Sequence, residues 1–203
     1  MNPQALDIVL AGVGGQGSVL ATQILGRAAI LAELPVVTSE VHGMSQRGGT
    51  VVTAVRLGRV DAAPAVPAGA ADFLVGFEPL EGVRQMSMLK PGGTAILSED
   101  PVLPVIEALR EADYPRDVGT LAAQAGHTAL MVPAAGIARD LGNPRLAGTV
   151  MLGVLAVYLD IPEDAWLTAI AESVPGKTVE ANLEAFRRGG EWRVMREKAI
   201  TAF

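Results

Sequence analysis

The chain of 203 residues contains no cysteine. Disulfides, Cys-ligated zinc, iron-sulfur clusters and thiolate nucleophiles are therefore excluded, because each of them needs a cysteine sulfur. Aromatic residues are also few, with 2 Trp, 2 Tyr and 4 Phe, and the 22 acidic side chains outnumber the 16 basic ones to give a net charge of -6. Nucleic acid is not an expected partner, since the chain has no net positive field to release counterions from a phosphate backbone.

Long apolar segments are missing as well. The longest helix-like stretch without a charge is residues 146–159, which is shorter than the roughly 20 residues that a membrane-spanning helix needs. Residues 8–26 are also uncharged, but glycines interrupt them and no basic segment precedes them as in a secretion signal. We therefore expect a buried helix at 146–159, no membrane association and a cytoplasmic location.

The first two thirds of the chain alternate between strand and helix patterns. A short apolar run at 7–11 leads into a glycine cluster, and residues 18–34 carry apolar side chains at helical spacing. The β-branched run 36–39 after Pro35 then completes a predicted βαβ unit. Further strands are predicted at 50–57, 72–77, 94–97 and 128–132, and further helices at 79–89 and 105–112. This alternation predicts an α/β fold, a Rossmann-like three-layer sandwich with a mostly parallel sheet.

The last third has a different character, with three predicted helices and no strand. These helices are predicted at 145–159, 163–174 and 178–188, after start signals that include proline. We expect a single domain over 1–203, in which the α/β sheet occupies 1–142 and the helical C-terminal segment 143–203 packs on it. Residues 187–203 hold five basic and two acidic side chains. This end is either a solvated tail or a docking surface for a partner subunit.

The first candidate motif is Gly12-Val-Gly-Gly-Gln-Gly17, which follows a strand and opens a helix as the G-x-G-x-x-G template requires. Glycines permit positive φ and a close approach to the backbone, and a helix N-terminus offers N–H donors and a partial positive charge. The turn can therefore hold an anion, or its glycines can simply let the strand and the helix pack tightly. Glu40, at the end of the second strand, stands roughly where a dinucleotide fold places its ribose-binding carboxylate.

The second candidate motif is Ser39-Glu-Val-His-Gly-Met-Ser-Gln-Arg-Gly-Gly49, a glycine-flanked loop rich in polar side chains. It follows the second strand, so in a parallel sheet we expect it beside the Gly12 loop at the carboxyl edge. His42 can exchange protons near neutral pH, and Arg47 can bind a carboxylate or phosphate with two hydrogen bonds. Two plainer interpretations remain open: His42 as an ordinary hydrogen-bonded loop histidine, and Arg47 as an ion-pair partner of Glu40. His127 is interpreted as structural.

Together the two motifs resemble the gamma subunit or domain of 2-oxoacid:ferredoxin oxidoreductases, and in particular the small beta subunit of indolepyruvate ferredoxin oxidoreductase. The second motif is the more specific, because relatives that act on other 2-oxoacids tend to carry different residues before the Arg-Gly-Gly. The likeness covers nearly the whole chain. It continues through Asn143-Pro144, Met151-Leu-Gly153, Val174-Pro-Gly-Lys177 and Asn182-Leu-Glu-Ala-Phe186.

The resemblance implies an oxidative decarboxylation, in which a 2-oxoacid such as an aryl pyruvate and coenzyme A give an acyl-CoA, carbon dioxide and reduced ferredoxin. Thiamine diphosphate and iron-sulfur clusters carry out this chemistry in the family. This chain contains no Gly-Asp-Gly motif for thiamine diphosphate and no cysteine for a cluster. We therefore expect neither cofactor to be bound by this chain alone, and both to reside in a larger partner subunit.

The resemblance also implies that the two loops face the partner's active site, exclude water from it and help to receive coenzyme A. The residues expected in supporting catalytic roles are His42, Gln46 and Arg47. The candidate cofactor-binding residues are Gly12, Gly14, Gly15, Gln16, Gly17, Glu40, Gly48 and Gly49. No metal site is expected in the chain.

Two other classes of function remain. The first is a stand-alone Rossmann-type NAD(P)-binding oxidoreductase that uses the same glycine turn. Its weakness is that the chain leaves little length for a substrate domain, and neither Tyr114 nor Tyr158 has a lysine four residues later, as a Tyr-x-x-x-Lys pair would require. The second is a nucleotide-binding module without catalytic activity.

Overall fold

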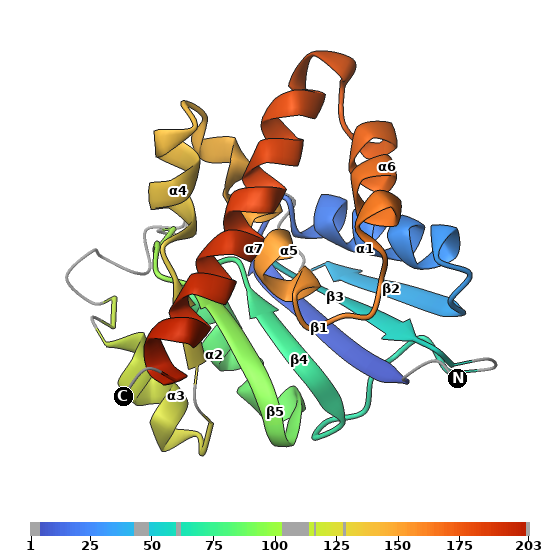
Figure 1. The fold of residues 1–203 in the computed structure, drawn as a ribbon. Coiled ribbons are helices and arrows are strands. Elements are labelled where there is room, and N and C mark those ends of the chain that lie inside the picture. The colour runs from blue at the N-terminus through green and yellow to red at the C-terminus, as the bar shows by residue number, and fades with distance from the viewer. Residues whose placement is uncertain are drawn as a thin grey trace.

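The fold was determined as a computed structural model that describes residues 5–42, 49–59, 62–102, 114–115, 117–127 and 129–201. A six-stranded sheet forms the middle layer, with the strand order β2-β3-β1-β4-β5-β6 (Figure 1). The strands are β1 (Leu6–Val13), β2 (Val36–His42), β3 (Thr50–Leu57), β4 (Ala71–Gly76), β5 (Leu89–Ser98) and β6 (Ala129–Val132). The α-helices are α1 (Ser18–Leu31), α2 (Pro79–Arg84), α3 (Val118–Gln124), α4 (Ala134–Asp140), α5 (Ala147–Ala156), α6 (Glu163–Ser173) and α7 (Val179–Thr201).

The sheet is parallel except for one strand. β4 pairs in parallel with β1 and β5, and β5 with β6, whereas β3 runs antiparallel to both of its neighbours, β1 and β2. The predicted α/β class with a mostly parallel sheet is therefore confirmed. The predicted βαβ unit needs a correction, because β2 is parallel to β1 but β3 lies between them. β3, the next strand along the chain, pairs antiparallel with β2 and takes the place beside β1.

Helices cover both faces of the sheet. Alternate residues of β1 point to opposite faces, so that Ile8 and Leu10 join one apolar cluster while Val9 and Ala11 join another. The first cluster is the larger and packs against α1, α4, α5, α6 and α7, whereas the second packs against α2, α3 and the short helix η1 (Met86–Met88). α1 and α2 therefore lie on opposite faces of the sheet. Figure 1 shows α1, α5, α6 and α7 together on one of these faces. No helix in the described ranges combines the length and apolar character needed to cross a bilayer.

The last helix is longer than the sequence pattern predicts. α7 runs to Thr201, although Gly189-Gly190 follows directly after the predicted end at Arg188. Packing explains the two glycines: a β-carbon on Gly189 would lie 2.1 Å from the carbonyl oxygen of Val150, and one on Gly153 would lie 2.0 Å from that of Phe186. The backbones of α5 and α7 touch where they cross, and this contact outweighs the low helix propensity of glycine.

A buried ionic cluster fixes the amino end of β1. Asp7 is 1% exposed and accepts hydrogen bonds from Nε and Nη2 of its cross-strand neighbour Arg56, at 2.7 and 3.1 Å. Arg59 donates to the same carboxylate at 3.2 Å, and the backbone N–H of Asp7 donates to Asp72. The hydrogen bonds to Asp7 are the main reason that the pKa of Arg56 is raised above its ordinary value. The cluster joins three strands at the edge opposite the glycine turn.

Asp7→Asn should lower the free energy of unfolding by about 3–5 kcal/mol, because it leaves the Arg56 guanidinium buried without its counter-charge. Urea denaturation of the purified chain measures this change. Glu172→Gln is the matched control, since it breaks an ion pair with Arg27 that is about half exposed and should cost less than about 1 kcal/mol. Equal losses in the two variants would contradict the role assigned to the buried cluster.

Candidate functional site

The glycine turn lies between β1 and β4, two neighbouring strands whose following helices pack on opposite faces of the sheet. β1 leads through Gly12–Gly17 into α1 on one face, whereas β4 leads through Phe77 and Glu78 into α2 on the other. Open α/β sheets usually hold their ligands in the crevice that forms at such a switch point. The turn has the backbone that its glycines predict, with φ of +99° at Gly15 and +86° at Gly17.

The side chain of Gln16 occupies this crevice. Its amide oxygen accepts a hydrogen bond from the backbone N–H of Val13 at 2.7 Å, and its amide nitrogen donates to the carbonyl oxygen of Phe77 at 3.0 Å. Gln16 therefore joins the end of β1 to the end of β4, which the sequence pattern did not predict. A glutamine between glycines offers no signal of its side-chain direction, so only the fold reveals this bridge.

Two further glycines allow the chain to close around Gln16. A β-carbon on Gly12 would lie 2.9 Å from Oε1 of Gln16 and 3.0 Å from Cβ of Phe77. A β-carbon on Gly148, near the start of α5, would lie 2.9 Å from the backbone oxygen of Gln16. We call this contact of Gly12, Gln16, Phe77 and Gly148 the turn junction. The cavity beside it has a volume of about 40 Å³, which admits a few waters but is far below the roughly 300–1,000 Å³ of typical ligand pockets.

The two candidate loops meet at the carboxyl edge. The backbone N–H of Gly14 donates a hydrogen bond of 3.0 Å to the carbonyl oxygen of Gly49, where the second loop returns to the sheet. The predicted neighbourhood of the two loops is thus confirmed at this pair. His42 is the last residue of β2 and pairs through its backbone position with Val51. Gln46, Arg47 and Gly48 lie outside the described residues.

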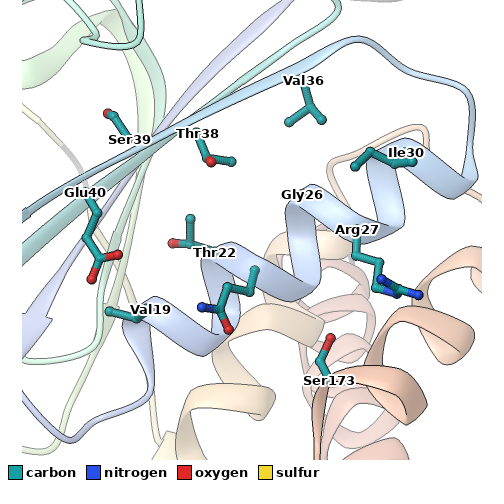
Figure 2. A pocket seen from close by; sticks show the side chains of 11 residues that line it. Val19, Thr22, Gly26, Arg27, Ile30, Val36, Thr38, Ser39, Glu40 and Ser173 are labelled. Atoms are coloured by element: carbon teal, nitrogen blue, oxygen red, sulfur yellow. The ribbon is translucent and has the colours of Figure 1, made fainter.

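Glu40 stands further from the turn than in a dinucleotide fold. Its register partner in β3 is Thr53, which is in turn the partner of Leu10 in β1. One strand therefore separates Glu40 from β1, which adds a strand spacing of about 4.8 Å. Glu40 instead borders a groove between α1 and β2, where it lies near Val19 in the first turn of α1 (Figure 2).

Two buried carboxylates, Glu78 and Glu81, follow β4 and were not among the predicted site residues. Glu78, 2% exposed, caps α2 by accepting from the backbone N–H of Glu81 at 2.7 Å, and it also accepts the hydroxyl of Tyr114 at 2.5 Å. Burial, followed by the hydrogen bond to Glu78, raises the pKa of Tyr114 above its ordinary value. Arg84 pairs with Glu81. The sequence signal that could have identified the pair is Glu78-Pro79-Leu80-Glu81, a capping pattern with proline at the first helical position.

Substitutions at Gly12 and Gly15 should destabilise the chain for different reasons. Gly12→Ala would place its β-carbon against Gln16 and Phe77, whereas Gly15 has nothing within 4 Å and resists a side chain only through its positive φ. Each change should cost about 1–3 kcal/mol of unfolding free energy. In a Gln16→Ala background, Gly12→Ala should cost less and Gly15→Ala the same, as measured by urea denaturation and a double-mutant cycle. Additive losses at Gly12 would show that Gln16 does not occupy the crevice.

Comparison with known proteins gives a consistent result. The family profile described as pyruvate ferredoxin/flavodoxin oxidoreductase matches residues 7–192. The chain is 36% identical over 188 residues to the indolepyruvate oxidoreductase subunit IorB of Thermococcus kodakarensis, covering 90% of this chain and 93% of that protein. It is 32% identical over 189 residues to the 2-oxoglutarate synthase subunit KorC of Methanothermobacter marburgensis, covering 91% of this chain and 95% of that one.

Solved structures share the fold. The gamma subunit of a keto/oxoacid ferredoxin oxidoreductase from Geobacter sulfurreducens superposes with a TM-score of 0.68 at 24% identity, covering 94% of this chain and 99% of that one. The 2-oxoglutarate:ferredoxin oxidoreductase from Magnetococcus marinus gives a TM-score of 0.73 at 21% identity, and here 95% of this chain corresponds to only 31% of that chain. The chain therefore belongs to the pyruvate ferredoxin/flavodoxin oxidoreductase family, as a gamma-type subunit of the 2-oxoacid:ferredoxin oxidoreductases.

Proposed function

We propose that this chain is the cofactor-free subunit of a 2-oxoacid:ferredoxin oxidoreductase that acts on indolepyruvate or another aryl pyruvate. With coenzyme A, the complex converts this substrate to the aryl acetyl-CoA and carbon dioxide, while ferredoxin accepts the electrons. The similarity to IorB subunits, at 36% identity against 32% for the KorC subunit compared above, supports the choice of an aryl substrate. The chain contributes part of the active-site wall, and a larger subunit contributes the reacting groups.

The observation that best supports this proposal is that the chain belongs to this family but contains no cysteine. An iron-sulfur cluster cannot be ligated without thiolates in the usual way. Among the described residues there is also no group of three or more His, Asp or Glu side chains that could hold a metal ion. The donor set of this chain therefore does not fit a cluster, and the proposal assigns thiamine diphosphate and the clusters to the larger subunit.

The carboxyl edge is the face that we assign to the larger subunit's active site. The glycine turn and the return of the second loop are joined there by the Gly14–Gly49 hydrogen bond, and Gly15 is exposed at the tip of the turn. On this face the chain would exclude water from a charged intermediate and present fixed hydrogen-bond donors. Gln46 and Arg47 remain the proposed donors. His42, at the end of β2, is proposed in a supporting role.

The end of α7 offers a second contact with a larger subunit. The segment from Arg187 onward continues α7 to Thr201, and it exposes Arg187, Arg188 and Met195. Arg193 and Arg196 are held over the rings of Tyr158 and Trp192, at 4.8 and 5.4 Å from the ring centroids. A helix end that is basic and partly apolar, on an otherwise acidic chain, fits the interpretation of this segment as a docking surface.

The turn junction argues against the stand-alone NAD(P)-binding alternative. A dinucleotide needs the crevice between the ends of β1 and β4, and Gln16 and Phe77 fill that crevice. Thermal-shift titrations of the isolated chain with NAD, coenzyme A and thiamine diphosphate separate the candidates, because a ligand at 100 times its Kd adds about 2.7 kcal/mol to stability. We expect no stabilisation by NAD or thiamine diphosphate. Strong stabilisation by NAD would support the oxidoreductase alternative.

Arg47→Ala should leave the chain folded but reduce turnover of the reconstituted complex. Loss of a hydrogen bond to a charged group costs about 1.5–3 kcal/mol, which corresponds to a roughly tenfold to hundredfold lower kcat/KM. Steady-state reduction of ferredoxin with the 2-oxoacid and coenzyme A measures the effect, and Arg27→Ala is the control, because Arg27 is half exposed on α1, outside this loop. Unchanged turnover in Arg47→Ala would remove this residue from the site.

A further inference from the structure

The outer edge of β2 is a long and regular strand edge. β2 is a terminal strand of the sheet, and all of its seven residues are in continuous register with β3, from Val36 opposite Leu57 to His42 opposite Val51. Natural edge strands are usually shortened, bulged, or guarded by lysine or proline. β2 is neither short nor bulged and carries no lysine, and its protection is limited to Pro35 before its first residue and the charge of Glu40. β6 at the other edge has only four residues. In the described ranges of the chain, no strand pairs with the outer side of β2.

The surface beside this edge is open and partly apolar. A groove of about 550 Å³ runs between α1 and β2, from Val19 and Glu40 to Ile30 and Val36 (Figure 2). Ile30 is 65% exposed, Leu31 44% and Val41 67%. These three are among the seven large apolar side chains that the described residues expose. Ile30 and Leu31 lie on α1, whereas Val41 shares the face of β2 that Ser39 presents away from α1, so apolar side chains are exposed on both faces beside this edge.

The sequence of β2 is complementary to itself in one antiparallel register. Residues that pair across two antiparallel strands point to the same face of the sheet, so each residue of β2 can pair only with a residue an even number of positions away in the second copy. One residue at the centre must therefore pair with its own copy, and the twofold axis passes between these two copies. An axis through Ser39 pairs all seven residues, with Val37 opposite Val41 and Thr38 opposite Glu40. An axis through Glu40 would instead place two carboxylates opposite each other, which is unfavourable.

We propose that β2 pairs with β2 of a second copy of this chain, about a twofold axis through Ser39, to form a homodimer with one continuous sheet. Main-chain hydrogen bonds along the paired edges provide the contact, and the Val37–Val41 pairs provide apolar burial on the face away from α1. The two grooves between α1 and β2 then lie side by side on the other face. The carboxyl edges of the two copies point in opposite directions, which leaves each copy its own face for a larger subunit.

A single cysteine tests the register directly, because the chain has no other thiol. Across the axis, the two Ser39 Cα atoms would be about 4.5–5.5 Å apart, within the roughly 4.4–6.8 Å that a disulfide spans. Figure 2 shows that Ser39 points away from α1, so its two copies would lie on the same face of the joined sheet. Ser39→Cys should therefore form a disulfide-linked dimer under mild oxidation. Val157→Cys, exposed at the end of α5, is the control and should not.

Sedimentation of the full chain without a thiol tests the same proposal. The wild-type chain should be dimeric, and Val41→Lys should raise the dimer Kd by about tenfold or more, because lysine disfavours pairing at an edge. Val194→Lys changes an exposed valine on α7 and should leave the dimer intact. A monomeric wild-type chain, or a dimer that Val41→Lys does not weaken, would overturn the proposal. Both measurements use this chain alone, so they stand apart from the test of its role in the complex.

Discussion

The structure depends on a close approach of chain segments at the turn junction, which glycines at 12 and 148 permit. β1, β4, α1 and α5 converge where the chain has glycine at 12 and 148, and in both places a β-carbon would lie within 3 Å of Gln16. Because no side chain fits there, the amide of Gln16 can bridge the ends of two strands and satisfy their backbone groups. The Gln16 bridge therefore closes the crevice where Rossmann-like sheets bind ligands, and it also fixes the glycine turn at the carboxyl edge of the sheet.

This constraint gives a familiar motif a different use. A G-x-G-x-x-G turn favours an anion when the crevice above it is empty. Here the crevice is filled from within the chain, and the turn is instead hydrogen-bonded through Gly14 to the end of the second loop. The turn thus holds the chain at Gly49, where it enters β3. This use of the turn fits the proposed function, in which the chain shapes another subunit's active site and needs no ligand pocket of its own.

The regular parts of the fold could be predicted from the sequence, because local patterns determine them. Residues 50–57 alternate and form β3 with these bounds, and the apolar spacing after Gly17 predicts α1. Contacts distant in sequence could not be predicted in this way. The insertion of β3 beside β1, the continuation of α7 through Gly189-Gly190 and the Gln16 bridge all depend on which backbones meet. For the candidate site, the adjacency of the two loops was predictable, whereas the buried Glu78–Tyr114 pair was not.

The central claim is that this chain shapes a catalytic centre whose reacting groups belong to another subunit. The most direct measurement compares ferredoxin reduction by the purified chain alone with reduction by the chain plus its larger subunit, each supplied with indolepyruvate, coenzyme A and thiamine diphosphate. The account predicts no reduction by the chain alone and activity in the mixture, with iron found only in the larger subunit. Reduction of ferredoxin by this cysteine-free chain without a second protein would contradict it.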